Sequence, residues 1–168
     1  MLRKEEIEQY LEELNQELRF LDVKGEICLY GGAVMCLVYN ARPSTKDVDA
    51  VFKPGQIIRD AAKKIAQHYG IDEDWLNDGV KGYVVTHPKK VLFNWSHLKV
   101  YVADAEYLLA MKSLAARVDG MDKEDIIFLI RELGIESPED VFDVLEKYYP
   151  HHRIRPTTQF FIEEIFEV

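Results

Sequence analysis

The residues best suited to chemistry lie in one stretch, GGAVMCLVYNARPSTKDVDAVF, which begins at Gly31 and ends at Phe52. Asp47 and Asp49 lie in a segment that alternates acidic and apolar residues, so we expect a strand with both carboxylates on one face. Two carboxylates held together are costly unless a cation lies between them. Mg²⁺ and Mn²⁺ prefer such oxygen ligands, and bound ions can clamp the oxygens of a phosphoryl displacement. The pair predicts a divalent-metal site; the alternative is two acids that face water at a sheet edge.

Gly31 and Gly32 open the same stretch, directly after the apolar run EICLY. Between a strand and a helix, two glycines let backbone N–H groups approach a phosphate closely, and the start of the helix favours an anion. The alternative is an ordinary tight turn. Glycines followed by the Asp pair on successive elements are a stronger signal than either feature alone.

The elements that must position these residues follow from the hydrophobic pattern. Helical spacing predicts helices over residues 3–20, 33–40 and 56–69, and apolar or alternating runs predict strands over 26–30, 46–52, 91–95 and 98–102. Residues 71–90 are turn-rich. Beyond residue 103 only helices are expected, beginning after Asp104, near Asp122, after Ser137 and after Pro156.

This order of elements predicts an α+β fold. We expect a small mixed sheet with helices packed on it over residues 1–102, and a helical C-terminal region over residues 103–168 that packs on this core. The chain of 168 residues is long enough for one domain with a substantial core.

Composition narrows the classes of partner. The formal net charge of −9 argues against broad, nonspecific nucleic-acid binding, which needs a basic face. Local basic groups remain, for which ordinary solvated charge is the simpler interpretation: Lys89 and Lys90, and Arg153 with Arg155.

The cysteines and the apolar runs indicate the compartment. Cys28 and Cys36 lie in apolar surroundings and predict buried thiols of a reducing compartment. No apolar run is long enough to cross a bilayer, and the acid-rich N-terminus is unlike a signal or transit peptide. We therefore expect a cytoplasmic protein without a membrane partner.

The order strand, Gly31-Gly32, helix, Thr45-Lys46-Asp47-Val48-Asp49 resembles the nucleotidyltransferase superfamily of the DNA polymerase beta type. The closer likeness is to its branch of AbiEii-type abortive-infection toxins and related minimal proteins. A second likeness lies in VADAEYLLAMKSLAARVDGMDKEDIIFLI, where a helix with a lysine and a basic residue precedes Asp-x-x-Asp. The resemblance covers about residues 25–135, and the two motifs together are fairly specific.

The resemblance implies roles for individual residues. Gly31, Gly32 and Thr45 would line the triphosphate, and Asp47 and Asp49 would hold Mg²⁺ or Mn²⁺. Four residues of the second motif follow: Lys112 would neutralise phosphate charge, Asp122 or Asp125 would complete the site or orient Lys112, and Arg117 would be an ion-pair partner. Many members also carry a third carboxylate on a later strand, and the strands predicted over 91–95 and 98–102 contain none.

The resemblance also implies an activity. A Mg²⁺-dependent nucleotidyltransferase would move a nucleotidyl group from an NTP to an RNA, a protein or a small-molecule acceptor. It could act as the toxin of a toxin–antitoxin pair, with an antitoxin or another protein as partner. One alternative is a protein of this fold that binds a nucleotide or a partner without catalysis. Another is an interaction domain in which the acids are incidental.

Overall fold

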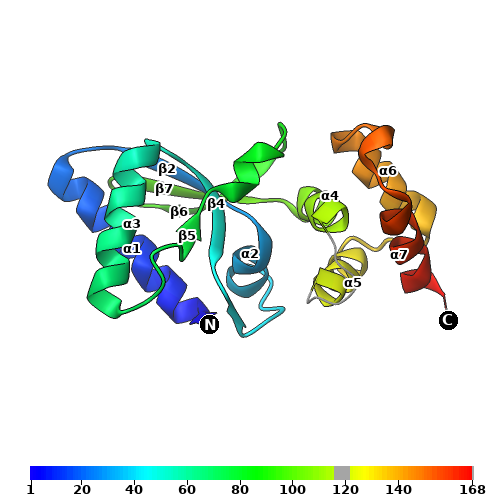
Figure 1. Cartoon of the computed structure of the whole chain (residues 1–168), viewed down its shortest axis with the longest axis horizontal. Coiled ribbons are helices and arrows are strands. Elements are labelled where there is room, and N and C mark those ends of the chain that lie inside the picture. The colour runs from blue at the N-terminus through cyan, green and yellow to red at the C-terminus, as the bar shows by residue number, and fades with distance from the viewer. Residues whose placement is uncertain (116–121, 168) are drawn as a thin grey trace. The chain divides into compact units, whose positions relative to one another are not determined.

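The computed structural model describes residues 1–115 and 122–167, which form two compact units (Figure 1). The first unit consists of Met1–Val84 and Lys89–Ala103, and the second of Val85–Pro88 and the chain from Asp104 onward. The fold class is α+β, as the sequence predicts. The described part of the chain contains helices, one mixed five-stranded sheet and one two-stranded sheet.

The first unit is built on the five-stranded sheet, whose order is β5-β4-β2-β7-β6. β4 is antiparallel to β2 and parallel to β5, while β7 is parallel to β2 and antiparallel to β6. The strands are β2 (Gly25–Leu29), β4 (Val48–Lys53), β5 (Leu76–Asn77), β6 (Lys89–Asn94) and β7 (Leu98–Ala103). The short strands β1 (Leu2–Arg3) and β3 (Ser44–Thr45) form the separate two-stranded sheet.

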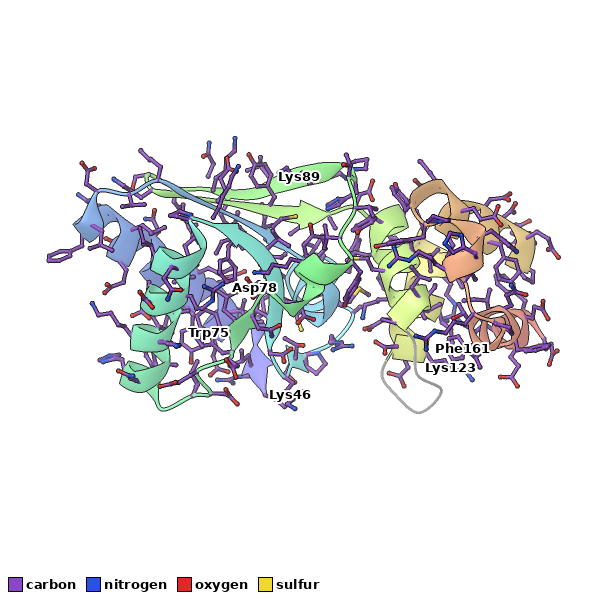
Figure 2. All side chains as sticks on the ribbon, turned by 45° about the horizontal axis from the view of Figure 1, so that its top comes forward. Lys46, Trp75, Asp78, Lys89, Lys123 and Phe161 are labelled. Carbon is purple, nitrogen blue, oxygen red and sulfur yellow. The ribbon has the colours of Figure 1, made fainter. Side chains whose placement is uncertain are left out.

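Two amphipathic helices, α1 (Lys4–Leu21) and α3 (Gly55–Tyr69), pack together along one side of this sheet (Figure 1). In β4, Val48, Ala50 and Phe52 are buried, and the residues between them are less so. Trp75, which Figure 2 labels, is also buried, and its indole N–H donates to the Ala62 carbonyl at 2.9 Å. This alternation leaves Asp49 on the opposite face of the strand from the helical core.

The structure differs from the sequence-based expectations in several elements near the candidate site. The helix expected over 33–40 is α2 (Gly31–Leu37), which includes both glycines. The strand expected from residue 46 starts at Val48, where the Val48 N–H donates to the Trp75 carbonyl at 2.6 Å and pairing with β5 begins. Asp47 therefore precedes the strand. The turn-rich stretch contains β5 and the 3₁₀ helix η1 (Gly79–Gly82), neither of which has a periodic signal.

The second unit is helical apart from its first residues. Its elements are α4 (Ala105–Ala115), α5 (Asp122–Glu132), α6 (Pro138–Tyr148), η2 (His151–Arg153) and α7 (Pro156–Phe166). Asp104 and Ser137, after which helices are expected, act as N-caps: the Tyr107 N–H donates to Asp104 Oδ1 at 2.9 Å, and the Asp140 N–H donates to Ser137 Oγ at 3.3 Å. Of the helices that the structure describes, none combines the length and the apolar character needed to cross a membrane.

Candidate functional site

The first predicted site residue, Gly31, lies directly against Asp49. β2 ends at Leu29, and the Tyr30 N–H then donates to the Asp49 carbonyl at 2.9 Å, which holds the following turn beside β4. Gly31 has φ +62°, a left-handed conformation that glycine adopts without steric cost. A Cβ atom at Gly31 would lie 2.9 Å from Asp49 Oδ2. The backbone conformation therefore favours glycine here, and a methyl group at this position would make the Asp49 carboxylate shift.

Gly32 is equally confined, by different groups. A Cβ atom there would lie 2.5 Å from both Arg42 Nη1 and Thr45 Oγ1. Thr45 is buried, and its hydroxyl donates to the Asp47 carbonyl at 3.3 Å. The glycine turn thus has a carboxylate on one side and a guanidinium with a hydroxyl on the other.

Arg42 is a member of this site that sequence reasoning missed. In the sequence it belongs to a turn-rich segment, NARPS, which carries no chemical motif. It reaches Gly32 because β3 pairs with β1 and brings the segment back along α2. The only sequence signal for Arg42 is its position close to the Asp pair, where a guanidinium group could bind a phosphate.

Asp47 lies one residue before β4 and is half-buried. Burial is the main cause that raises the pKa of its carboxyl group; the Lys46 charge lowers this pKa and the Asp72 charge raises it further. A carboxylate that is costly to ionise gains from a bound cation, which would offset both the burial and the repulsion from Asp72. This electrostatic setting suits a metal ligand.

The chain offers few ligands from which to build a metal centre. Within residues 1–115 and 122–167, no three His, Cys, Asp or Glu side chains gather closely enough to hold an ion. Asp47 and Asp49 would therefore need further oxygen atoms from a bound ligand and from water. Mg²⁺ is commonly bound in this way, by one or two carboxylates together with substrate phosphates.

Asn77 is a second residue that sequence reasoning missed. The parallel pairing of β4 with β5 sets Asn77 directly beside Asp49, on the same face of the sheet. β4 lies between β5 and β2, and on the β5 side the neighbour of Asp49 is a neutral amide rather than a carboxylate. A two-residue strand leaves no pattern by which to find it.

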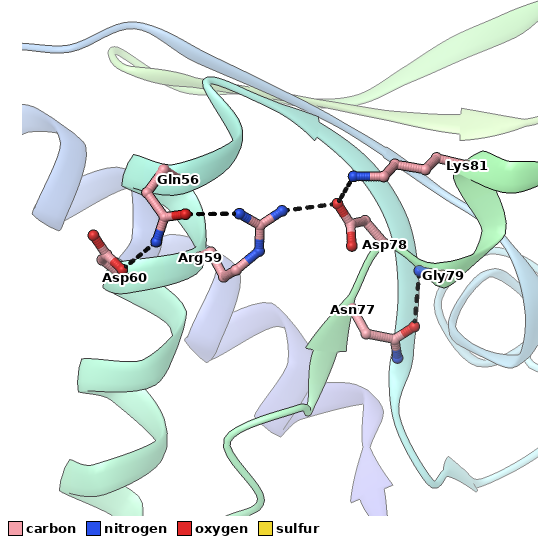
Figure 3. Close-up of polar contacts among 7 residues, drawn as sticks. All are labelled: Gln56, Arg59, Asp60, Asn77, Asp78, Gly79 and Lys81. Atoms are coloured by element: carbon pink, nitrogen blue, oxygen red, sulfur yellow. Dashed lines mark hydrogen bonds and ion pairs between the residues drawn. The ribbon is translucent and has the colours of Figure 1, made fainter.

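The residue after Asn77 fixes the end of β5. Asp78 Oδ2 forms ion pairs at 2.9 Å with both Arg59 Nη2 and Lys81 Nζ (Figure 3). The hydrogen bond from Lys81 is the largest cause that holds the Asp78 pKa below its usual range, and the bond from Arg59 adds to it. The network ties β5 to α3 and η1 and so supports the position of Asn77.

The second motif forms a cluster of its own within the second unit. Lys112 Nζ lies 2.7 Å from Asp125 Oδ2 and 3.6 Å from Asp122 Oδ1. The Lys112 side chain is 8% exposed and that of Asp125 is 4% exposed, so Lys112 is not an ordinary surface lysine. The resemblance implies that Asp122 or Asp125 would complete the site or orient Lys112; both carboxylates lie within ion-pair distance of its ammonium group, and Asp125 is the nearer. Arg117 lies outside the described residues.

Comparisons with protein-family models, with curated proteins and with solved structures found no significant match. The assignment of a function therefore depends on the residues of the two units.

Proposed function

We propose that the chain is a Mg²⁺- or Mn²⁺-dependent nucleotidyltransferase. The observation that carries this proposal is the close approach of the Asp49 carboxylate to the left-handed Gly31. A carboxylate beside a backbone that has no side chain can hold a cation while a phosphate group lies on the exposed peptide. The nucleotidyltransferase motif that the sequence resembles also combines a glycine pair with Asp-x-Asp.

In this proposal, the residues of the first unit bind and orient the triphosphate. Asp47 and Asp49 would hold the divalent ion, which supplies neutralisation of charge that develops on the phosphoryl oxygens. The peptide groups of Gly31 and Gly32 would face the phosphates, and Arg42 beside Gly32 adds a positive charge. Thr45 fixes the segment before β4 through its bond to the Asp47 carbonyl.

The resemblance implies that Lys112 would neutralise phosphate charge, and its ion pairs with Asp122 and Asp125 lie within the second unit. A compact ammonium group suits this task, and its two carboxylate partners limit the positions it can adopt. Asp125 is the nearer and more buried partner, so it is the positioning residue. Asp122, which is 35% exposed, is the one with access to solvent and to a ligand.

The test of nucleotide binding is calorimetry with ATP, GTP, CTP and UTP in the presence of Mg²⁺. We expect the parent protein to bind at least one NTP and Asp49→Asn or Asp47→Ala to lose most of the affinity. Asp60→Asn is the matched control, because Asp60 is an exposed carboxylate on α3 that bonds only to Gln56. Equal affinity in Asp49→Asn and the parent would contradict the proposal.

A second candidate is nucleotide binding without catalysis, and one observation favours it. Asn77, a neutral residue, lies beside Asp49, so the strand neighbour that could have supplied another acid does not. Transfer of label from an NTP to an RNA, protein or small-molecule acceptor separates the two candidates. Co-purification with a protein encoded beside it would support the toxin–antitoxin form of the proposal.

A further inference from the structure

We propose that Asn77 is a ligand-binding residue whose side-chain N–H donates a hydrogen bond to an oxygen of the nucleotide held at Asp49. The inference rests on the proposed function and deepens it, because it assigns a contact to a residue that no motif includes.

The register of the two strands fixes the place of Asn77. Val48 pairs with Leu76 and Asp49 with Asn77, and neighbouring parallel strands lie about 4.8 Å apart. Val48 and Leu76 are both buried in the core, so their successors turn to the opposite face. Asn77 is half-buried there, next to the carboxylate that faces Gly31.

The orientation of the Asn77 amide follows from its one hydrogen bond. The Gly79 backbone N–H lies 3.3 Å from the Asn77 side chain, and an N–H can only face the oxygen, Oδ1 (Figure 3). The nitrogen, Nδ2, is then on the other side of the amide and carries two N–H donors. Among the described residues, these donors have no hydrogen-bond partner, and Nδ2 is not one of the buried side-chain atoms that lack one, so it is open to a ligand or to water.

The chemistry of a donor at this point is specific. A neutral amide beside Asp49 adds no negative charge and does not repel a phosphate. A carboxylate at the same place would add a negative charge and would repel a phosphate. The amide N–H groups match the oxygen atoms of a phosphate or a ribose, and a bond to a charged oxygen is stronger than one to a neutral group. Asn77 therefore fits a ligand contact better than a metal ligand.

Asn77→Asp exchanges a single group and tests this directly. The aspartate keeps an oxygen for the Gly79 N–H, so the turn is preserved, and it replaces the donor with a negatively charged acceptor. We expect the affinity for the Mg²⁺–NTP complex to fall at least about tenfold in Asn77→Asp and about tenfold in Asn77→Ala, while the melting temperature of Asn77→Asp stays close to that of the parent.

Asn94 supplies the matched control. It is an exposed asparagine at the end of β6, on the far side of the sheet order from β5, so Asn94→Asp and Asn94→Ala should bind the nucleotide as the parent does. Unchanged or tighter nucleotide binding in Asn77→Asp would overturn the inference, since it would show that position 77 serves as a metal ligand or contacts nothing. If Asp49→Asn abolished binding at the same time, the proposed function would stand without the inference. Absence of nucleotide binding by the parent would overturn both.

Discussion

Replacing Gly31 by alanine tests whether the Asp49 carboxylate is held against the glycine turn. Two costs add at this position. An L-residue in the left-handed region costs about 1–2 kcal/mol, because Gly31 has φ +62°. The new methyl group would also lie 2.9 Å from Asp49 Oδ2, the end of a side chain that must then rotate away, at about 0.5–1.5 kcal/mol for a side chain displaced from its rotamer.

Gly70→Ala separates the two costs. Gly70 ends α3 in the same left-handed conformation, with φ +66°, but a Cβ atom there would meet no heavy atom within 4 Å. Urea denaturation should therefore give a loss of about 1–2 kcal/mol for Gly70→Ala. For Gly31→Ala the loss should be larger by about 0.5–1.5 kcal/mol.

A double mutant identifies the group that causes the additional loss. If the methyl group meets the carboxylate, Gly31→Ala should cost less in an Asp49→Ala background, with a coupling of about 0.5–1.5 kcal/mol. Equal losses for Gly31→Ala and Gly70→Ala, together with no coupling to Asp49, would refute the placement of the carboxylate. Nucleotide affinity should follow the same order, with Gly31→Ala impaired and Gly70→Ala unchanged.

Three further predictions concern other parts of the chain. Asp125→Ala leaves Lys112 without its nearest partner in a buried position and should cost about 3–5 kcal/mol in urea denaturation, whereas the double variant Lys112→Met with Asp125→Leu should cost clearly less; equal losses would contradict a buried ion pair. The folded-state pKa of Asp47 is raised, mainly by burial, so folding favours the neutral carboxyl group. The stabilisation from this group is fully present below the usual carboxyl pKa of about 4, and it is lost as the pH rises through the raised pKa. Asp47→Asn without metal should thus melt above the parent at about pH 7 and together with it at about pH 3, and a lower melting temperature at both pH values would refute this reasoning. Ser137→Ala removes the acceptor of the Asp140 N–H and should cost about 1 kcal/mol, and no loss in thermal unfolding would show that the cap is replaced by water.

Much of the fold could be predicted because its helices and longer strands bury one regular face. The spacing of Ile7, Leu11, Leu14 and Leu18 defines the buried side of α1, and the alternation in β4 separates core residues from Asp49. Such periodic burial is written in the local sequence, and it led to the α+β class.

The rest of the candidate site depends on contacts between segments that no local pattern reports. Asn77 belongs to a two-residue strand whose position is set by pairing with β4, and Arg42 reaches Gly32 only because its turn folds back along α2. The burial of Lys112 has a sequence signal, since α4 is apolar on nearly every side and is buried from Tyr107 to Ser113. The contact between Lys112 and Asp125 depends on the packing of α4 against α5 in the second unit.

The measurement that most directly tests nucleotidyl transfer uses α-³²P-labelled NTPs, Mg²⁺ and separate pools of RNA, protein and small-molecule acceptors. We expect the parent protein to transfer label from at least one NTP to one pool. Transfer should disappear in Asp49→Asn and on removal of Mg²⁺, and it should persist in Asp60→Asn. Label transfer that is equal in Asp49→Asn and the parent, or no transfer from any NTP to any pool, would contradict the assignment of a nucleotidyltransferase.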